Sequence, residues 1–444
     1  MDIAIIGAGY TGLTAAHDLG KAGHTVTLYE ALPEAGGLAT GFKAPHWSWR
    51  LEKFYHHLFT NDDDIIGLAK EVGIGDALTT YSPSTDLIHE GKPYRFDGLI
   101  GGITYPGLSL VEKARVGVAM YYLKFLKNWK PLEQVTAHEW LTRAMGASGY
   151  AKTFEPLLYG KFGDEYRSVP MSWFWARIYK RTPKLIYFDG GFQTFTDALA
   201  RAVGAQGATF HLNTRVSAIR RAGGRWEVES SQGTHRFDRV ISTVSPGLMT
   251  KLTPELPSNY LAALRDLKSL GAVVMTVALK HKLTDHSYWL SLDKRKYPML
   301  ALVEHTNMAD PRHYGGDHLV YVGDYLPADH PYLKMDADEL FEHYEPALKS
   351  FNPAYERSWV TGKWVFSTPY AQPIPPLRYS ERIPPLKTPL PGLYFASMSQ
   401  VYPWDRGTNY AVEMGHKVAS TLQSDSVPAP QPESEAVEPQ SLTA

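Results

Sequence analysis

The chain contains no cysteine among its 444 residues, and this absence removes several kinds of chemistry at once. Without thiols there are no disulfides, no thiolate metal sites and no cysteine nucleophiles, and no cysteine can tether a prosthetic group. An excess of charge of one sign is also missing, because 45 basic and 46 acidic residues give a net charge of -1. We therefore expect no nucleic-acid partner.

Long apolar runs are missing as well. No stretch approaches the roughly 18 apolar residues of a membrane span. The first apolar segment begins within three residues of Met1, which leaves no room for a cleavable leader. We therefore expect a soluble, cytoplasmic protein, and its length favours two domains over a single core.

Closely spaced glycines follow the first apolar segment. A short buried strand over residues 2–6 precedes a G-x-G-x-x-G pattern, and a second apolar run over 24–29 ends at Glu30. In a dinucleotide-binding βαβ unit the first glycine permits the tight turn, the second admits a pyrophosphate, and the third lets the helix approach the strand. The carboxylate can accept hydrogen bonds from a ribose. The predicted contacts are Gly7, Gly9, Tyr10, Thr11, Gly12 and Glu30, although glycines at this spacing also form ordinary turns.

A second glycine pair, Gly36 and Gly37, comes soon after Glu30. The pyrophosphate of an extended FAD would pass here, so the pair favours FAD over NAD, with Leu38 and Ala39 as further contacts. Paired glycines also mark turns in general, and that alternative stays open.

Periodicity predicts the remaining elements in outline. Helices are expected over 62–72, through much of 104–147, and over 196–204. Strands are expected over 208–212, 215–219, 225–228, 237–243 and 271–279. The segment 424–444 is rich in Pro, Ser and Glu and is expected to be a disordered tail.

Several segments together resemble one superfamily of flavoproteins. The segments 191–195, 212–216 and 237–243 are similar to the middle of flavin amine oxidases, protoporphyrinogen oxidases and phytoene desaturases, and 391–396 with 406–415 is similar to their closing FAD motif. The resemblance implies an α/β fold with a Rossmann-like FAD-binding domain of the glutathione-reductase type and an inserted α+β substrate domain. The expected FAD-binding parts are 1–80, 189–250 and 386–423, and the expected substrate-domain parts are 81–188 and 251–385.

The resemblance also assigns roles to residues outside the first motif. Val216 would recognise adenine through its backbone, and the segment Arg406, Gly407, Thr408 and Asn409 would open a last helix over 410–421 beneath the isoalloxazine ring. A helix N-terminus there stabilises negative charge on the reduced flavin. The alternative is that Arg406 and Gly407 only turn the chain into a helix. One departure is that Ala396-Ser397-Met398 stands where relatives usually carry Ala-Gly-Asp, so an expected carboxylate is missing.

A segment dense in histidine and aromatic residues, 52–61, resembles the part of these enzymes that passes close to the flavin. Glu52 and His56 occupy matching positions, and Phe54 replaces a glycine. Histidine is the side chain most easily poised near neutrality, so His56 is a candidate acid or base. A purely structural role for the two adjacent histidines is equally compatible with the sequence.

A second aromatic cluster, 173–181, carries Arg177 and Arg181. Aromatic rings beside arginines suggest a pocket that stacks an apolar or ring-bearing substrate and holds an anionic group. The arginine spacing also resembles UDP-galactopyranose mutases. The alternative is a helix face whose arginines form surface ion pairs.

An apolar stripe at helical spacing runs through 108–129, with Lys113, Lys124, Lys127 and Lys130 interleaved. Such stripes flanked by lysines can contact membranes. They are more commonly part of a protein core, and we expect core here and predict no membrane contact.

The sequence as a whole favours an FAD-dependent oxidoreductase with non-covalently bound FAD. It would transfer a hydride to flavin N5 from a small organic substrate, which is an amine, a polyene or isoprenoid, or a sugar-linked compound. His56, Arg177 and Arg181 are the candidate catalytic residues, and no metal site is expected. The alternatives are a non-redox nucleotide-sugar mutase and a flavin-fold scaffold without turnover. The sequence leaves the oligomeric state open.

Overall fold

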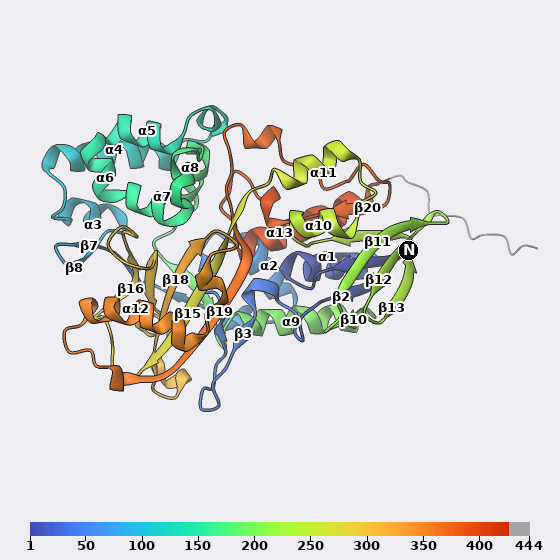
Figure 1. The fold of residues 1–444 in the computed structure, drawn as a ribbon, viewed down its shortest axis with the longest axis horizontal. Coiled ribbons are helices and arrows are strands. Elements are labelled where there is room, and N and C mark those ends of the chain that lie inside the picture. The colour runs from blue at the N-terminus through green and yellow to red at the C-terminus, as the bar shows by residue number, and fades with distance from the viewer. Residues whose placement is uncertain (426–444) are drawn as a thin grey trace, which may run out of the picture.

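The structure is a computed structural model that describes residues 1–425, apart from the side chain of Leu99. Two lobes lie side by side, with the N-terminus in one and a helical layer above a long sheet in the other (Figure 1). The predicted tail over 424–444 lies outside the described residues from 426 onward.

A five-stranded parallel sheet forms the centre of the first lobe. Its strands are short and largely buried on both faces, as parallel strands require, and the strand at one edge is partly exposed. Their spatial order is β10 (Thr209–His211), β2 (Thr25–Tyr29), β1 (Asp2–Ile6), β14 (Arg239–Ser242) and β20 (Leu393–Phe395). The predicted strands over 2–6, 24–29 and 208–212 are thereby confirmed.

Helices α1 (Tyr10–Lys21), α2 (Asp63–Glu71), α9 (Phe192–Ala205) and α13 (Thr408–Gln423) pack around this sheet. Helix α13 approaches α1 so closely that a Cβ on Gly415 would lie 2.5 Å from the Cβ of Thr14. The predicted helices over 62–72, 196–204 and 410–421 are confirmed. Helix α9 begins four residues earlier than predicted, at Phe192, because the Glu52 carboxylate accepts the Phe192 N–H.

The segment 237–243, predicted as one strand, belongs to two different sheets. Strands β11 (Val216–Ala222), β12 (Arg225–Ser230) and β13 (Gly233–Phe237) form a separate antiparallel sheet, with Phe237 opposite Trp226. The next residue but one, Arg239, pairs with Ile3 of the parallel sheet. The chain changes partner at Asp238, so a single alternating pattern concealed two strands.

A seven-stranded sheet forms the floor of the second lobe, and α12 (Ala337–Phe351) packs against it. The predicted strand over 271–279 is confirmed as β15. The order is β19 (Val360–Pro373), β15 (Ser269–Leu279), β18 (His318–Leu326), β17 (Ala301–Glu304), β16 (Ser287–Ser291), β7 (Ser84–His89) and β8 (Lys92–Arg95).

Smaller elements connect the lobes. Strand β9 (Leu185–Phe188) pairs with β5 (Leu58–Phe59) and β6 (Leu78–Tyr81), and β3 (Gly41–Phe42) pairs with β4 (Leu51–Glu52). Helices α10 (Pro246–Leu252) and α11 (Ser258–Arg265) come after β14 in the chain, and α10 contacts β11.

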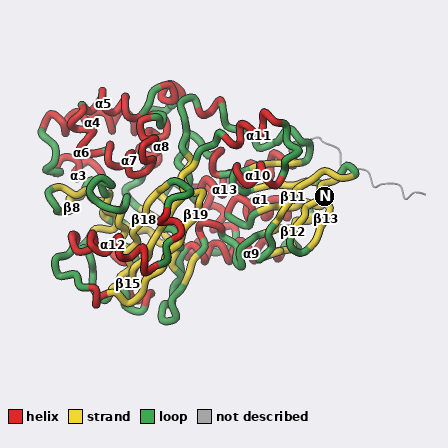
Figure 2. Tube along the Cα trace, in the orientation of Figure 1, coloured by secondary structure: helices red, strands yellow, loops and turns green. Residues whose placement is uncertain are grey.

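Helices form the layer above the long sheet, as Figure 2 shows in red. They are α3 (Gly98–Thr104), α4 (Leu110–Phe125), α5 (Ala137–Met145), α6 (Ala147–Thr153), α7 (Glu155–Phe162) and α8 (Met171–Lys180). The helical prediction for 104–147 is confirmed in outline. No helix in the part of the chain that the structure describes is long and apolar enough to cross a membrane.

The prediction that the stripe on α4 is core is wrong. Leu110, Val118 and Phe125 are 84%, 71% and 65% exposed. The residues of α4 that pack inward are Val116, Ala119 and Leu123. The helix therefore has apolar side chains on both faces, and packing against the protein covers only one of them.

Candidate active site

The glycines of the first motif form a tight turn between β1 and α1. Gly7 has φ +104°, a conformation that strongly favours glycine, and a Cβ on Gly12 would lie 2.0 Å from the Gly7 carbonyl oxygen. Gly9 faces the second glycine pair, since its Cβ would lie 3.9 Å from the Cα of Gly37. No side chain among residues 1–425 caps the N-terminus of α1, so its N–H groups are available to an anion.

Glu30 lies at the end of β2 beside this turn. Its carboxylate accepts the N–H groups of Ala8 and Leu32, each at 2.9 Å. The Glu30 carbonyl oxygen accepts the N–H of Thr214 at 2.8 Å, which holds the segment before Val216 against the same edge. The predicted adenosine contacts Glu30 and Val216 are therefore linked through the loop that precedes β11.

The side chains of Tyr10 and Thr11 are engaged with the protein. The Tyr10 hydroxyl donates to the Phe192 carbonyl oxygen at 3.1 Å, and the Thr11 hydroxyl donates to that of Ala411 at 3.0 Å. Only the backbone of these two predicted contacts is left for a ligand. Leu38 and Ala39 lie in a single 3-10 turn that begins at Gly37.

The N-terminus of α13 also lacks a side-chain cap among the described residues, and Gly407 occupies the N-cap position. Thr408 is buried. The Asn409 side chain accepts the Ile65 N–H and donates to the Asp64 carboxylate, both at 3.1 Å. Asn409 thus joins α13 to α2, and its predicted ligand contact would be made by its backbone alone.

His56 lies partly buried in the loop between β4 and β5. Its Nδ1 contacts the Phe54 carbonyl oxygen at 2.5 Å, and because that oxygen only accepts, Nδ1 carries the hydrogen and Nε2 is an acceptor. Burial, together with the Arg406 charge, lowers the pKa of His56 to about 4. The expectation of an imidazole poised near neutrality is therefore not met, and His56 is neutral at pH 7.

Glu52 is buried behind this loop, with an exposed fraction of 1%. It accepts hydrogen bonds from the Phe192 N–H at 2.7 Å and from the Tyr187 hydroxyl at 2.9 Å. Burial raises the pKa of Glu52 to about 7, although both hydrogen bonds oppose that shift. The side chain fixes the start of α9 relative to β4.

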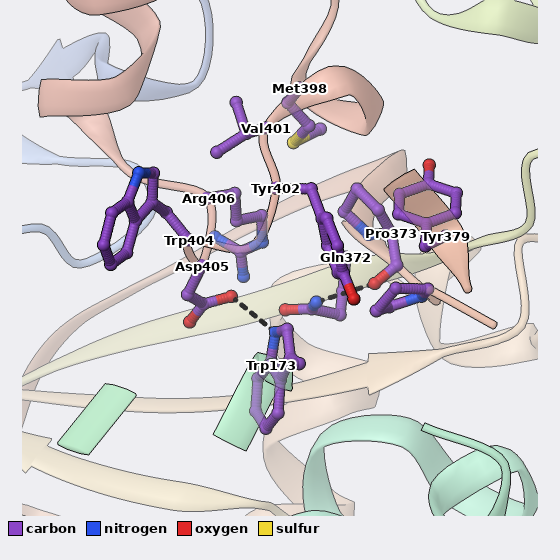
Figure 3. Close-up of a pocket in the computed structure, with 11 residues that line it drawn as sticks. Trp173, Gln372, Pro373, Tyr379, Met398, Val401, Tyr402, Trp404, Asp405 and Arg406 are labelled. Atoms are coloured by element: carbon purple, nitrogen blue, oxygen red, sulfur yellow. Dashed lines mark hydrogen bonds between the residues drawn. The ribbon is translucent and has the colours of Figure 1, made fainter. Parts of the chain in front are cut away.

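A cluster of charges surrounds Asp405 in the loop before α13. Figure 3 shows Asp405 and Arg406 of this loop and the hydrogen bond between Asp405 and the Trp173 indole. Arg177 of α8 pairs with the carboxylate, Lys161 of α7 donates to it at 2.8 Å, and the Trp173 indole donates at 3.2 Å. Burial alone would raise the pKa of Asp405, but the charges of Lys161, Arg177 and Arg406 outweigh it and hold that pKa well below its usual value. Asp405 is therefore ionised.

Arg406 extends from the same loop towards the second lobe. Its guanidinium bonds the Tyr325 hydroxyl and lies 5.0 Å from the centre of that ring. Its charge adds to the effect of burial in lowering the pKa of His56. Burial, with smaller contributions from the charges of Arg181 and Arg177, lowers the pKa of His57 to about 3. The histidine segment, α8 and the loop before α13 therefore meet at one place.

Arg181 differs from Arg177 in its surroundings. It is an exposed residue that follows the last turn of α8, and its guanidinium donates to the Thr85 hydroxyl at 3.0 Å. The structure brings Arg177 into the charged cluster and leaves Arg181 at its outer edge.

A family model described as flavin-containing amine oxidoreductase matches residues 10–422. The chain belongs to this family. A protein of Mycobacterium tuberculosis that is named as a flavin-containing monoamine oxidase is 26% identical over 280 residues, covering 59% of this chain and 61% of that protein. The chain thus matches about three fifths of that relative's length.

Solved structures share the fold. An oxidoreductase from Methanosarcina mazei has a TM-score of 0.74 at 20% identity and covers 96% of this chain and 100% of its own. A reduced UDP-galactopyranose mutase has a TM-score of 0.72 at 16% identity and covers 95% of each chain. The predicted resemblance and the Rossmann-like α/β fold class are confirmed.

The residues of this family member fit an FAD. Two helix N-termini without side-chain caps, those of α1 and α13, lie on helices that touch along Gly415. The space beside Gly9 and Gly37 is one that a larger side chain would fill. The end of β20, where relatives usually carry an acid, is closed by the Gln400 amide oxygen, which accepts the Ser397 N–H at 2.7 Å.

Sequence reasoning did not assign roles to Asp405 and Lys161. Asp405 directly precedes the closing motif over 406–415, and an acid next to Arg406 before a helix is a usable signal. Lys161 lies outside the segments that the sequence analysis singled out. Tyr187 and Tyr325 carry no comparable signal, because their positions depend on packing between distant strands.

Proposed function

We propose that the protein is an FAD-dependent oxidoreductase that oxidises a small organic substrate. FAD, when bound, supplies the two-electron acceptor for a hydride that leaves the substrate. The chain would hold it non-covalently, since no cysteine is present. Gly7, Gly9 and Glu30 would contact its ADP half, and the backbone of Gly407 would contact its ring.

One observation supports this proposal above all others. Three segments that the sequence singled out separately, around His56, Arg177 and Arg406, converge next to the open N-terminus of α13. Such a convergence of polar groups at a cofactor-binding helix end is typical of an active site.

In this proposal His56 serves proton transfer and Arg177 serves substrate binding. Neutral His56 would offer Nε2 to a proton that the substrate releases when its hydride departs. Arg177 and Arg406 together carry two positive charges against the single negative charge of Asp405, while burial and Arg177 lower the pKa of Lys161 well below its usual value. The surplus favours a substrate with an anionic or strongly polar group, which Arg177 would hold.

The mutase alternative makes a different use of the same cationic cluster, which would hold a nucleotide diphosphate. The decisive experiment is an anaerobic titration of the purified yellow protein with an amine, a polyene and a nucleotide sugar. Bleaching by a substrate with formation of one equivalent of oxidised product supports the oxidoreductase. Conversion of a nucleotide sugar only after reduction with dithionite, without net oxidation, supports the mutase. A protein that binds no flavin would overturn both.

A further inference from the structure

Apolar side chains are exposed on two consecutive helices at the outer end of the helical layer. Eight of the eleven large apolar side chains exposed among residues 1–425 lie on α3 and α4. Scattered exposed apolar residues are ordinary in soluble proteins, but a concentration of them marks an interaction surface. The eight are Ile100, Ile103, Leu110, Val111, Val118, Tyr121, Tyr122 and Phe125.

The exposed residues of α4 form a continuous stripe. Positions 110, 114, 118, 121 and 125 recur every three or four residues, so they share one face of the helix. The inward residues Val116, Ala119 and Leu123 lie on the opposite face and belong to the core of the helical layer. Helix α4 therefore presents a second apolar face that the folded chain does not cover.

The segment that carries this stripe is rich in basic residues. Residues 92–130 contain seven basic and two acidic residues, whereas the whole chain has a net charge of -1. Lys113 precedes the stripe's second turn, and Lys127 follows the end of the helix. Within the described residues, no ion pair involves Lys92, Lys113 or Lys127, so these charges are available to a partner.

We propose that α3 and α4 form a docking surface for an anionic lipid bilayer. The apolar stripe would enter the headgroup region, where Tyr121 and Tyr122 suit the boundary between acyl chains and water. The surrounding lysines would contact lipid phosphates, each adding to the attraction. A second copy of the chain fits less well, because a symmetric contact would bring the same cationic rim against itself.

The docking surface is tied to the helix that carries Arg177. The Lys124 ammonium group donates to the carbonyl oxygens of Ile178, Tyr179 and Arg181, at 3.3, 2.9 and 2.8 Å. These carbonyls close the C-terminal end of α8. The stripe and the candidate active site are therefore connected through one rigid contact.

Cosedimentation of the full-length protein with vesicles tests the proposal. We expect binding to vesicles of equal parts phosphatidylglycerol and phosphatidylcholine, and weaker binding to phosphatidylcholine alone or at high salt. The double variant Val118→Glu/Phe125→Glu should bind at least about tenfold less, because it places carboxylates on the apolar face. Lys113→Gln and Lys127→Gln should each weaken binding to the anionic vesicles by about fivefold.

Leu248→Glu is the matched control, since Leu248 is an exposed apolar residue on α10, outside the surface. Its vesicle binding should equal that of the unmodified protein. Circular dichroism should show the same melting curve for all variants, because every substituted side chain is exposed or partly exposed. Absence of vesicle binding, or equal loss in Leu248→Glu, overturns the proposal. A dimer in light scattering that Val118→Glu/Phe125→Glu dissociates, without vesicle binding, assigns the face to a second copy instead.

Discussion

Arg177 and Asp405 form an ion pair across 228 residues of sequence, and this pair joins the helical layer to the loop that opens α13. The Arg177 guanidinium also lies 5.2 Å from the centre of the Trp173 ring. An arginine held on two sides in this way is oriented before any ligand arrives, which reduces the entropy that a bound anion has to overcome.

Arg177→Ala is expected to raise KM by about tenfold to a hundredfold with little change in kcat, because an anchor far from the reacting bond acts equally in the ground and transition states. Arg236→Ala removes an exposed arginine of β13 and should leave both constants unchanged. Steady-state kinetics at constant flavin content measures the effect. A fall in kcat at unchanged KM would place Arg177 in the chemical step.

His56→Ala is expected to lower kcat by roughly 10²–10⁴-fold if Nε2 accepts the substrate's proton. Because the pKa of His56 is lowered to about 4, the neutral base persists above that pH. The His56-dependent part of kcat/KM should therefore be flat from neutrality down to about pH 5 and fall only below it. Stopped-flow flavin reduction measures the step, and an unchanged reduction rate in His56→Ala leaves this histidine a structural role.

Gly9→Val is expected to abolish flavin binding, because the side chain would extend into the space between Gly9 and Gly37. Gly67→Val is the control, since a Cβ there meets no atom within 4 Å. The ratio of flavin to protein absorbance gives the occupancy. Full occupancy in Gly9→Val would locate the cofactor elsewhere.

Glu30→Ala is expected to weaken FAD binding by about 1–3 kcal/mol through the loss of charge-assisted hydrogen bonds. Glu30→Gln keeps an acceptor for one of the N–H groups of Ala8 and Leu32. Its affinity for FAD should lie between those of the unmodified protein and Glu30→Ala. Dissociation constants from flavin reconstitution measure both variants. Equal affinity in all three proteins would exclude a ribose contact by this residue.

Glu52→Gln is expected to alter how stability depends on pH. The native pKa of about 7 lies above the ordinary value of 4.5, so the folded state holds more protons between these values. The free energy of unfolding of the unmodified protein should therefore decrease by up to about 3 kcal/mol as pH rises through this window. Glu52→Gln should lack that decrease, whereas Glu52→Ala, which leaves the Phe192 N–H unpaired, should be destabilised throughout. Urea titrations from pH 4.5 to 8 measure this difference. The same pH dependence in the unmodified protein and in Glu52→Gln would mean that the pKa of Glu52 is not raised.

The local sequence predicted an element correctly where a single local rule determines that element. The β1 turn follows from glycines whose steric reason is local, and α2 follows from a short apolar pattern at helical spacing. The strand predicted over 237–243 takes in the end of β13 and all of β14, because β pairing is decided by distant partners, here Trp226 and Ile3. The prediction that the apolar stripe of α4 is core was wrong because periodicity shows which residues share a helix face but not what covers that face.

The sequence by itself determined the cofactor-binding unit, since backbone conformation at Gly7 and close approach at Gly12 depend on neighbours only a few residues away. It also pointed to His56 and Arg177 as residue types suited to chemistry. Only the tertiary structure decided that Arg177 pairs with Asp405, that burial and the Arg406 charge keep His56 neutral, and that one face of α4 is exposed. Each of these depends on burial and on charges contributed by segments hundreds of residues apart, which no local pattern encodes.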